Sequence, residues 1–566
     1  MKELFARLAA RPLIAAELVA ASFFANLLAL ASPLFVIQVL NRYVAYGVDA
    51  TLATLTAGVV IAIVLEFAFR QLRLKLAAGV NAGKDVALSA AAFDVLIGAK
   101  AAALDRLPPG LQREVVNATD SIQTAYSPVN VAAVLDVPFA LLFVAVLALL
   151  SPVLAVIAGS FLVVVFLASL VSHSTLRRPV RDLTSASGHR NALVGSAVAA
   201  GDAVRAFNSA PFLRRIWKET GSLFQGLKRH IAGRQGIVQT ATQSSQALMG
   251  VAIIAVGAMQ VVAGDLNVGA MIGANILAAR ALGPVAKLAQ LSEVFAKARQ
   301  SLDLLREFAR IPHERPAGSI LGEYKGGLEF RDLSFSHPGG SGPLFESLSL
   351  KLAPGAVLVV AGANGTGKTT LARLIVGLLE PSRGKILIDG VDLAQIQPEW
   401  WRRQIVYMPQ EPHFLNASLR DNLLAFNPEL DEEGQNKVIR SAGLRRFLDE
   451  SPQGFATPIT QNGANLSLGI RRRLALARAL AGDGRLVVVD EPTEGLDVEG
   501  SQQVYRVLNE FAHRGSAIIA FSHDPQIIKG TRHILDLNSK PVPRMISAAK
   551  DTPAPQAARP KHEKSS

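Results

Sequence analysis

Apolar and polar positions divide the chain into two parts of different character. Before about residue 300, long apolar runs alternate with segments rich in Arg and Lys. After Pro312 the apolar runs become short and are separated by polar turns, as in a soluble α/β domain. Six of the long runs approach the roughly 20 residues that a helix needs to cross a bilayer. These runs are residues 13–40, 52–69, 131–150, 153–171, 247–263 and 268–288. The pattern therefore predicts six membrane spans followed by a soluble α/β part.

The same pattern sets the expected domain boundaries. Residues 1–302 make up the predicted α-helical transmembrane domain, and residues 303–327 make up a linker. Residues 328–540 make up the predicted α/β domain, which begins with the strand-like Leu328–Phe330. Residues 541–566 are rich in Pro, Ala, Lys and Ser, and this composition predicts a disordered basic tail.

Two long segments between the spans are expected to extend the helices beyond the membrane. Residues 70–128 and 173–240 are rich in Ala, Leu, Arg, Lys and Gln, which favours helical hairpins. Pro and Gly interrupt the helical pattern at Asp105–Gly110 and Ser209–Leu213. We expect these turns to contact the soluble part, with exposed loops as the alternative.

Charge and composition support a membrane protein. The 566 residues are 50% hydrophobic, and the mean hydropathy of +0.31 is too high for an ordinary cytosolic enzyme. Basic residues gather in the two long segments between spans, and Lys2, Arg7 and Arg11 precede the first span. By the positive-inside rule these parts face the cytoplasm, and an even number of spans returns the α/β domain to that side.

Much of the net charge of +13 is therefore expected to lie in loops beside the membrane spans and in the C-terminal tail. Nucleic acid is not an expected partner, because no zinc-finger, RNA-binding or helix-turn-helix motif accompanies the charge. The sequence contains no cysteine, which excludes disulfides, thiolate metal sites and thiol catalysis.

A glycine-rich motif in the α/β part indicates which compound supplies the protein with energy. Residues 362–370 read Gly-Ala-Asn-Gly-Thr-Gly-Lys-Thr-Thr and follow the strand-like Val357–Ala361. In such a P-loop the glycines let the backbone wrap around phosphates, the Lys reaches the terminal phosphates and the first Thr ligates Mg²⁺. The sequence therefore predicts ATP and Mg²⁺ as cofactors. The expected nucleotide-binding residues are Gly362, Asn364, Gly365, Gly367, Lys368, Thr369 and Thr370.

Further candidates stand at the ends of other apolar strands. One strand-like run ends in Asp490 and Glu491, of which Asp490 can hold the water shell of Mg²⁺ and Glu491 can polarise the attacking water. Gln410 precedes this run, where it can sense Mg²⁺ and the γ-phosphate, and His523 follows another strand. The expected metal ligands are Thr369, Gln410 and Asp490, and the expected catalytic residues are Glu491, His523 and Lys368.

A short motif between Gln410 and Asp490 carries a resemblance to a known family. Residues Asn465–Ile470 have the sequence Asn-Leu-Ser-Leu-Gly-Ile and precede a strongly helical segment. They resemble the signature Leu-Ser-Gly-Gly-Gln of ATP-binding cassette (ABC) transporters. The resemblance implies the ABC exporter fold and a dimer, in which Ser467 and Gly469 of one cassette bind the ATP held by the other. A second copy of the chain is the expected partner, with a homologous chain as the alternative.

The sequence departs from the family pattern at several positions. Leu468 and Ile470 replace the first Gly and the Gln of the signature, and a left-handed backbone at position 468 would cost of order 1 kcal/mol or more with Leu. His337 stands where the family has an aromatic residue that stacks on adenine, and imidazole can still stack. Gly495 stands where Ala is common. Because Lys368, Asp490, Glu491 and His523 are all present, we expect active hydrolysis rather than a regulatory cassette that only binds ATP.

Three segments of the membrane part narrow the resemblance. Residues Phe24–Arg42, Asp136–Ala140 and Gly269–Pro284 resemble the first, third and sixth spans of bacterial type I secretion ATPases. The resemblance implies ATP-driven export of an unfolded polypeptide across the bacterial inner membrane, together with a periplasmic adaptor and an outer-membrane channel. The first span begins almost at Met1, which matches the short class without an N-terminal peptidase-like domain. The alternatives are an exporter of lipid, glycan or small peptide, and an ATP-binding regulator.

Overall fold

The computed structural model describes residues 2–107, 109–315, 317–337, 339, 342–531 and 533–547. Contacts within the chain divide it into two units. The first contains the residues up to Pro312 except Lys100–Ala102, and the second contains that short segment and the chain from His313 onward. The first unit is helical and the second is α/β, so the predicted fold class is confirmed.

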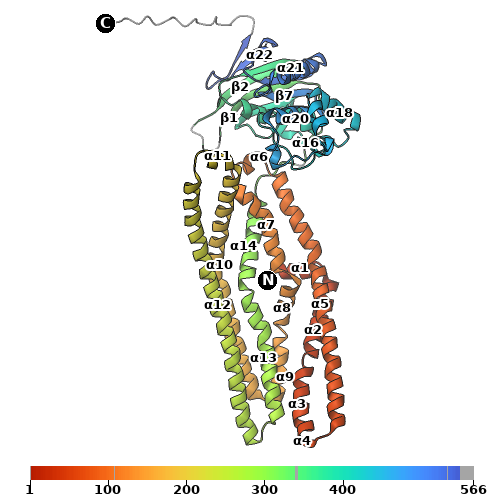
Figure 1. Ribbon diagram of the computed structural model, residues 1–566, viewed down its shortest axis with the longest axis vertical. Helices are drawn as coiled ribbons and strands as arrows, with labels where there is room; N and C mark the ends of the chain where they lie inside the picture. Colours follow the sequence, from red (N-terminus) through yellow and green to blue (C-terminus); the bar gives the residue numbers. More distant parts are fainter. Residues whose placement is uncertain are drawn as a thin grey trace, which may run out of the picture. The chain divides into compact units, whose positions relative to one another are not determined.

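The first unit consists of α-helices joined by short turns (Figure 1). The helices of its N-terminal part are α1 (Lys2–Ala9), α2 (Pro12–Leu28), α3 (Ala31–Gln38), α4 (Val44–Tyr46), α5 (Asp49–Gly98), α6 (Ala101–Leu104) and α7 (Pro109–Ala125). They are followed by α8 (Pro128–Asp136), α9 (Ala140–Leu150), α10 (Pro152–Ala199), α11 (Gly201–Ala206), α12 (Ala210–Ala263), α13 (Val268–Gln290) and α14 (Ser292–Phe308).

Six stretches of helix in this unit are long and apolar enough to cross a membrane. They are Pro12–Tyr46, Asp49–Gly98, Pro128–Leu150, Pro152–Val171, Ala210–Ala263 and Val268–Gln290. Each predicted apolar run lies inside one of them. The six predicted spans are therefore confirmed in number and in position.

Two of the spans are interrupted at proline. The first span breaks between Leu28 and Ala31, and the third breaks between Asp136 and Ala140. Proline has no backbone N–H, so Pro33 and Pro138 cannot donate to the carbonyl four residues earlier, and their rings crowd that carbonyl. Each of these two spans therefore consists of more than one helix, and the prolines give the reason.

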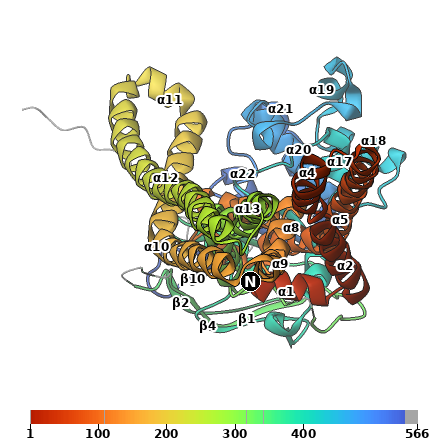
Figure 2. The ribbon, with the colours of Figure 1, turned by 90° about the horizontal axis from the view of Figure 1, so that it is seen from below.

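The longest helices continue well beyond the length of a bilayer span. Helices α5, α10 and α12 have 50, 48 and 54 residues. Figures 1 and 2 show α10 and α12 side by side, with α11 joining their ends. The helical extensions expected for residues 173–240 thus form a hairpin of two helices.

The turn of this hairpin lies slightly earlier than expected. Helix α12 already begins at Ala210, so the predicted break at Ser209–Leu213 is wrong by about one turn. The chain instead reverses around Asn208, whose φ is +51°. Pro211 lies in the first turn of α12, where its missing N–H leaves no helical hydrogen bond unmade.

The other expected turn, Asp105–Gly110, lies between α6 and α7, and Pro108 within it is outside the described residues. That these turns contact the α/β unit stays a prediction.

Small residues of α13 allow a close approach to α3 and to the π-helical segment Val39–Tyr43 that follows it. A side chain at Gly269 would place Cβ 2.4 Å from Asn41 Oδ1, and one at Gly273 would place it 2.3 Å from Ile37 Cγ1. Membrane helices without a hydrophobic driving force between them pack through such small residues. This packing is the structural use of the Gly-rich and Ala-rich segment of the sixth span.

Most of the predicted linker is ordered. Helix α14 extends to Phe308, which is buried, so residues 303–308 belong to the first unit. Further on, Arg402 donates to both carboxylate oxygens of Glu314 at 2.7 Å, and Tyr324 is buried against Trp401. The segment predicted as a linker, residues 303–327, is thus held by contacts of its apolar and charged residues, including the buried Phe308 and the Glu314–Arg402 ion pair.

The second unit is built on two sheets. A six-stranded sheet has the order β10-β9-β3-β8-β7-β6, and a four-stranded antiparallel sheet has the order β2-β1-β4-β5. The strands are β1 (Leu328–Phe335), β2 (Phe345–Leu352), β3 (Val357–Ala361), β4 (Arg383–Ile388), β5 (Val391–Asp392), β6 (Ile405–Met408), β7 (Leu486–Asp490), β8 (Ala517–Phe521), β9 (His533–Asp536) and β10 (Arg544–Ser547). Strands β3, β6, β7, β8 and β9 run parallel.

Helices α15, α16, α20 and α21 pack against strands of the six-stranded sheet. The α-helices of this unit are α15 (Lys368–Ile375), α16 (Pro398–Arg403), α17 (Leu419–Leu424), α18 (Glu432–Ser441), α19 (Arg445–Glu450), α20 (Leu468–Leu480), α21 (Val498–His513) and α22 (Pro525–Lys529). Every residue of β7 and β8 is buried, as expected for parallel strands that are covered on both faces.

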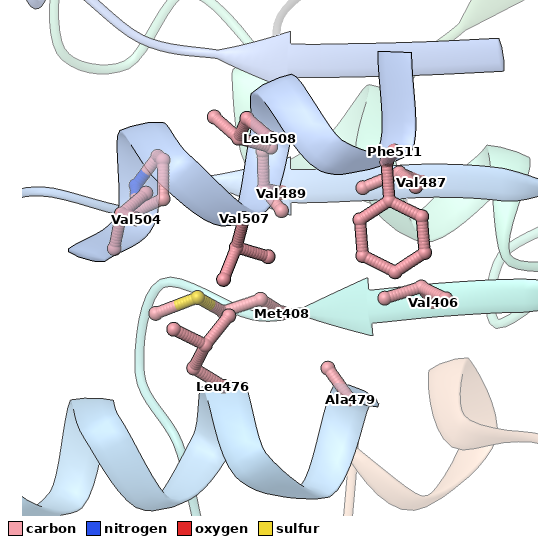
Figure 3. A pocket seen from close by; sticks show the side chains of 11 residues that line it. Val406, Met408, Leu476, Ala479, Val487, Val489, Val504, Val507, Leu508 and Phe511 are labelled. Carbon is pink, nitrogen blue, oxygen red and sulfur yellow. The ribbon is translucent and has the colours of Figure 1, made fainter. Parts of the chain in front are cut away.

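Figure 3 shows one of the two apolar cores of this unit, where β6 and β7 meet α20 and α21. Side chains such as Val406, Leu476 and Val507 surround a cavity of about 10 Å³. That volume is at the lower limit for a single water molecule, and the walls are apolar. The cavity is thus part of the packed core. The apolar side chains of this core hold α20 and α21 against β6 and β7.

The C-terminal boundary also differs from the expectation. Residues 544–547 form β10, which pairs antiparallel with β9 through Ile546 and Ile534. The predicted tail therefore does not begin at residue 541, because this short segment adds an edge strand. The rest of the predicted tail, residues 548–566, lies outside the described residues.

Candidate nucleotide site

The P-loop follows β3 and leads into α15. Gly365 and Gly367 have φ angles of +80° and +108°, which only glycine adopts without strain. A side chain at Gly367 would also place Cβ 2.7 Å from Leu344, and one at Gly362 would place it 2.5 Å from Thr366 Oγ1. The loop is therefore bare backbone at these positions, and Asn364 between them is exposed.

Lys368 is the first residue of α15 and is almost fully buried. Its ammonium group donates to the Gly362 carbonyl at 2.7 Å and lies 2.9 Å from Glu491 Oε1. His523 Nδ1 lies 3.2 Å from Lys368 Nζ and 3.0 Å from Glu491 Oε1. The three predicted catalytic residues thus form one cluster.

Sheet topology explains why these residues meet. In the parallel pairs, Phe521 on β8 is opposite Val360 on β3 and Asp490 on β7. The carboxyl ends of the three strands therefore lie at one edge, which is where ligands bind in parallel α/β sheets. Residues that directly follow these strands, such as Glu491 and His523, are brought together there.

Glu491 has an unusual backbone. Its φ is +47°, its N–H donates to the Phe521 carbonyl at 2.8 Å, and its own carbonyl accepts from Arg472 Nη1 at 3.1 Å. A left-handed non-glycine residue costs of order 1 kcal/mol or more, and such strain is often found at functional sites. The surrounding hydrogen bonds hold this conformation, which points the carboxylate at Lys368.

Asp490 ends β7 and has no exposed surface. Burial raises the pKa of its carboxyl to about 6, and the nearby Thr369 hydroxyl opposes this shift. The Thr369 hydroxyl itself donates to Gln410 Oε1 at 3.2 Å. Both carboxylate oxygens of Asp490 are thus buried near the Thr369 hydroxyl, and neither has a hydrogen-bond donor within bonding distance in the described part of the chain.

This donor set fits a hard cation. Mg²⁺ prefers oxygen ligands and keeps several waters or phosphate oxygens, so one or two protein carboxylates suffice. Among the described residues no group of three or more His, Asp or Glu could hold a metal by itself. The oxygen atoms of Thr369, Gln410 and Asp490 thus suit a cation that completes its coordination with waters and phosphate oxygens.

The signature residues lie at the start of α20. Ser467 is the N-cap, and its Oγ accepts from the Ile470 N–H at 3.3 Å. Leu468 is the first helical residue and has a right-handed backbone, so the conformational cost that was anticipated at this position does not arise. A side chain at Gly469 would meet no atom within 4 Å.

Leu468 contacts the loop after Glu491. Gly495 in that loop has a φ of +69°, and a Cβ there would lie 2.8 Å from Leu468 Cδ2. The two departures from the family pattern are therefore neighbours, and the small residue at 495 makes room for the large one at 468.

Not all predicted residues join the cluster. Within the described residues, no hydrogen bond connects Ser467 or Gly469 with the P-loop of the same chain. His337 lies after β1, is exposed, and packs edge-on against Phe335 with ring centroids 5.1 Å apart. Thr370 lies in the first turn of α15, next to Thr369.

The structure adds two residues that sequence reasoning missed. Glu494 accepts hydrogen bonds from Gln410 and from Arg472, which lies on α20. A charged residue three positions after Glu491 was visible in the sequence. Its partners could not be identified, because they come from segments more than 20 residues away.

Comparisons with known proteins agree with this architecture. Residues 16–285 match the ABC transporter transmembrane region, and residues 345–494 match the ABC transporter family. The chain is 29% identical over 525 residues to the alpha-hemolysin translocation ATP-binding protein HlyB of Escherichia coli, which covers 92% of this chain and 73% of that protein. It is 28% identical over 520 residues, with the same coverage, to the exotoxin translocation ATP-binding protein PaxB of Pasteurella aerogenes. The leukotoxin export ATP-binding protein LtxB of Aggregatibacter actinomycetemcomitans is similar to the same extent as PaxB.

A solved structure shares the fold. A bacterial Atm1-family ABC exporter with ATP bound aligns with a TM-score of 0.81 and 19% identity, over 93% of this chain and 94% of that one. Together with the P-loop, the signature helix and the six spans, these similarities establish the family. The chain is an ABC transporter with a membrane domain and an ATP-binding domain, and its enzymatic activity is that of an ATPase coupled to transport.

Proposed function

We propose that this transporter exports an unfolded polypeptide from the cytoplasm across the bacterial inner membrane, as the ATPase of a type I secretion system. The observation that carries the proposal is the similarity to toxin-translocating proteins, which extends over 92% of the chain and so includes the membrane domain. The cassette alone would not distinguish this role, because exporters of other cargo use the same chemistry. A second copy of the chain, a periplasmic adaptor and an outer-membrane channel are the partners this role requires.

The nucleotide would bind along the P-loop. The loop N–H groups and the N-terminus of α15 would receive the phosphates. Lys368 would exchange its contact with Glu491 for the terminal phosphates, which frees the Glu491 carboxylate to orient and deprotonate the attacking water. His523 would then contact the γ-phosphate rather than Glu491.

The metal would be held by Thr369 and by Asp490 through water, with Gln410 beside it. When bound, Mg²⁺ neutralises charge on the phosphate oxygens. Asp490 suits this place because its buried oxygens have no other donor among the described residues. His337 would lie against the adenine ring, and Ser467 and Gly469 would bind the ATP of the second copy.

Secretion by cells that lack this chain tests the proposed cargo. We expect that after deletion at least one polypeptide no longer appears in the medium and instead accumulates in the cytoplasm. The intact chain should restore secretion, whereas Glu491→Gln should not. Unchanged secretion, together with ATPase activity that lipid stimulates in the purified chain, would instead support a lipid exporter. A purified chain whose phosphate release equals that of Glu491→Gln would contradict the catalytic assignment.

A further inference from the structure

The loop after Glu491 contains a charged side chain that the chemistry described above does not use. Glu494 is about half exposed, and its Oε2 accepts from Gln410 Nε2 at 3.2 Å and from Arg472 Nη2 at 3.2 Å. A Glu carboxylate can only accept hydrogen bonds, and both of these bonds come from side-chain nitrogen donors.

This acceptor fixes the orientation of the Gln410 amide. An amide has one oxygen that accepts and one nitrogen that donates. Because a carboxylate cannot donate, Nε2 must face Glu494, and Oε1 then faces Thr369, whose hydroxyl donates to it at 3.2 Å. Thr369 could not impose this orientation, since a hydroxyl can accept as well as donate. Only the amide oxygen is a ligand for Mg²⁺.

The second hydrogen bond ties the amide to the signature helix. Arg472 lies on α20, its side chain is 7% exposed, and its other terminal nitrogen, Nη1, donates to the Glu491 carbonyl at 3.1 Å. Glu494 therefore links Gln410 both to α20, the helix that Ser467 caps, and through Arg472 to the main chain that carries Glu491.

We infer that Glu494 is a positioning residue for the metal-bearing nucleotide: it turns the Gln410 oxygen toward the metal and anchors that orientation to α20 through Arg472. The inference rests on the nucleotide and metal roles proposed above. It predicts that Glu494 acts on the contribution of Mg²⁺ to binding and not on nucleotide binding in general.

Equilibrium binding of a fluorescent ATP analogue to the purified full-length chain, with Mg²⁺ or with excess chelator, tests the inference. In Glu494→Ala we expect the gain in affinity that Mg²⁺ provides to fall by about 10- to 150-fold, the range for losing a hydrogen bond to a charged group. Affinity in chelator should stay within about twofold of the starting chain. The Mg²⁺ concentration for half-maximal ATPase activity should rise by a similar factor.

Matched variants separate this role from a structural one. Glu510→Ala removes the same charge from an exposed site on α21 and should change neither value. Glu494→Gln keeps the shape of the side chain but can present either end of its amide, so it should show an intermediate loss. Adding Glu494→Ala to Gln410→Ala should cause little further loss, because both act through the same amide.

Two results would overturn the inference. One is that Mg²⁺ increases nucleotide affinity in Glu494→Ala as much as it does in the starting chain. If the alanine variant does not fold, the same result in Glu494→Gln would overturn the inference. The other is an equal loss of affinity with Mg²⁺ and with chelator, which would indicate a role in the fold alone. A starting chain that binds nucleotide but secretes nothing would contradict the proposed cargo and leave this inference standing.

Discussion

The P-loop side and the signature side of the cassette differ in how much of their chemistry one chain completes. On the P-loop side, Lys368, Glu491 and His523 contact one another at 2.9 to 3.2 Å, and the first two are buried. On the signature side, Ser467 is exposed and its hydroxyl caps its own helix. The first side is organised within the chain, whereas the second presents its donors outward. In the proposed dimer, the nucleotide of a second copy would supply phosphate to these donors, which would account for the difference.

The largest effect on ATP hydrolysis is expected from a substitution on the P-loop side. We expect Glu491→Gln to lower ATP hydrolysis by roughly 10²- to 10⁴-fold, the usual contribution of a positioned general base, while ATP binding persists. Phosphate release by the purified full-length chain measures the rate, and a fluorescent ATP analogue measures binding. Glu510→Gln on α21 is the control. Loss of binding together with hydrolysis would mean that Glu491 supports the fold of the site rather than the reaction.

The signature side should respond less strongly. We expect Ser467→Ala to reduce hydrolysis by about tenfold, because a hydrogen bond to a charged phosphate oxygen would be lost. The substitution also removes an N-cap, which costs about 1 kcal/mol of stability. Ser418→Ala is a matched control, since Ser418 caps α17 in the same way without belonging to the signature. If both variants lose activity equally, capping rather than phosphate binding explains the effect.

The contact between Leu468 and Gly495 predicts a coupled effect on stability. We expect Gly495→Ala to destabilise the cassette by about 1–3 kcal/mol, because it combines a left-handed backbone with a 2.8 Å overlap. In the Leu468→Ala background the cost should shrink by about 1 kcal/mol, since the overlapping atoms are gone. Thermal unfolding of the full-length chain and its single and double variants measures the coupling.

Gly515→Ala measures the cost of a left-handed backbone alone, without the side-chain overlap. Gly515 has a similar φ of +76°, but a Cβ there meets no atom within 4 Å. The loss of stability in Gly515→Ala should therefore come from backbone strain only, and it should be the same whether residue 468 is Leu or Ala. Additive effects of Gly495→Ala and Leu468→Ala would show that the two positions are not coupled.

The smallest expected effect concerns the adenine. We expect His337→Tyr to strengthen ATP binding by about two- to fivefold, since a larger aromatic ring adds roughly 0.5–1 kcal/mol of stacking. Affinities for ATP and for a triphosphate with a pyrimidine base, measured in parallel, test this. The gain should be larger for ATP, and His513→Tyr at the end of α21 should change neither. An equal gain for both nucleotides would place residue 337 away from the base.

The sequence predicted those features that depend on local pattern. Apolar runs of bilayer length located all six spans, and the motif from Gly362 to Thr370 lies between β3 and α15 as expected. The convergence of Glu491 and His523 on Lys368 was also foreseeable, because residues after neighbouring parallel strands meet at one edge.

Features that depend on distant partners could not be predicted. No local pattern indicates that Glu314, within the predicted linker, pairs with Arg402, which lies 88 residues later. Strand β10 has only 4 residues, and its pairing with β9 gives it a structure that its composition does not indicate. The role of Glu494 likewise became visible only through its contact with Gln410, 84 residues earlier.

The contacts of Lys368 have a consequence for nucleotide selection. A single ammonium group is shared by the Gly362 carbonyl, Glu491 and His523. A nucleotide must replace these internal partners to bind. Its affinity is expected to increase with the negative charge that it places near Lys368. ATP carries a terminal phosphate that ADP lacks, so the chain's own carboxylate is expected to compete better against ADP. Glu491 would thereby favour release of the product as well as its formation.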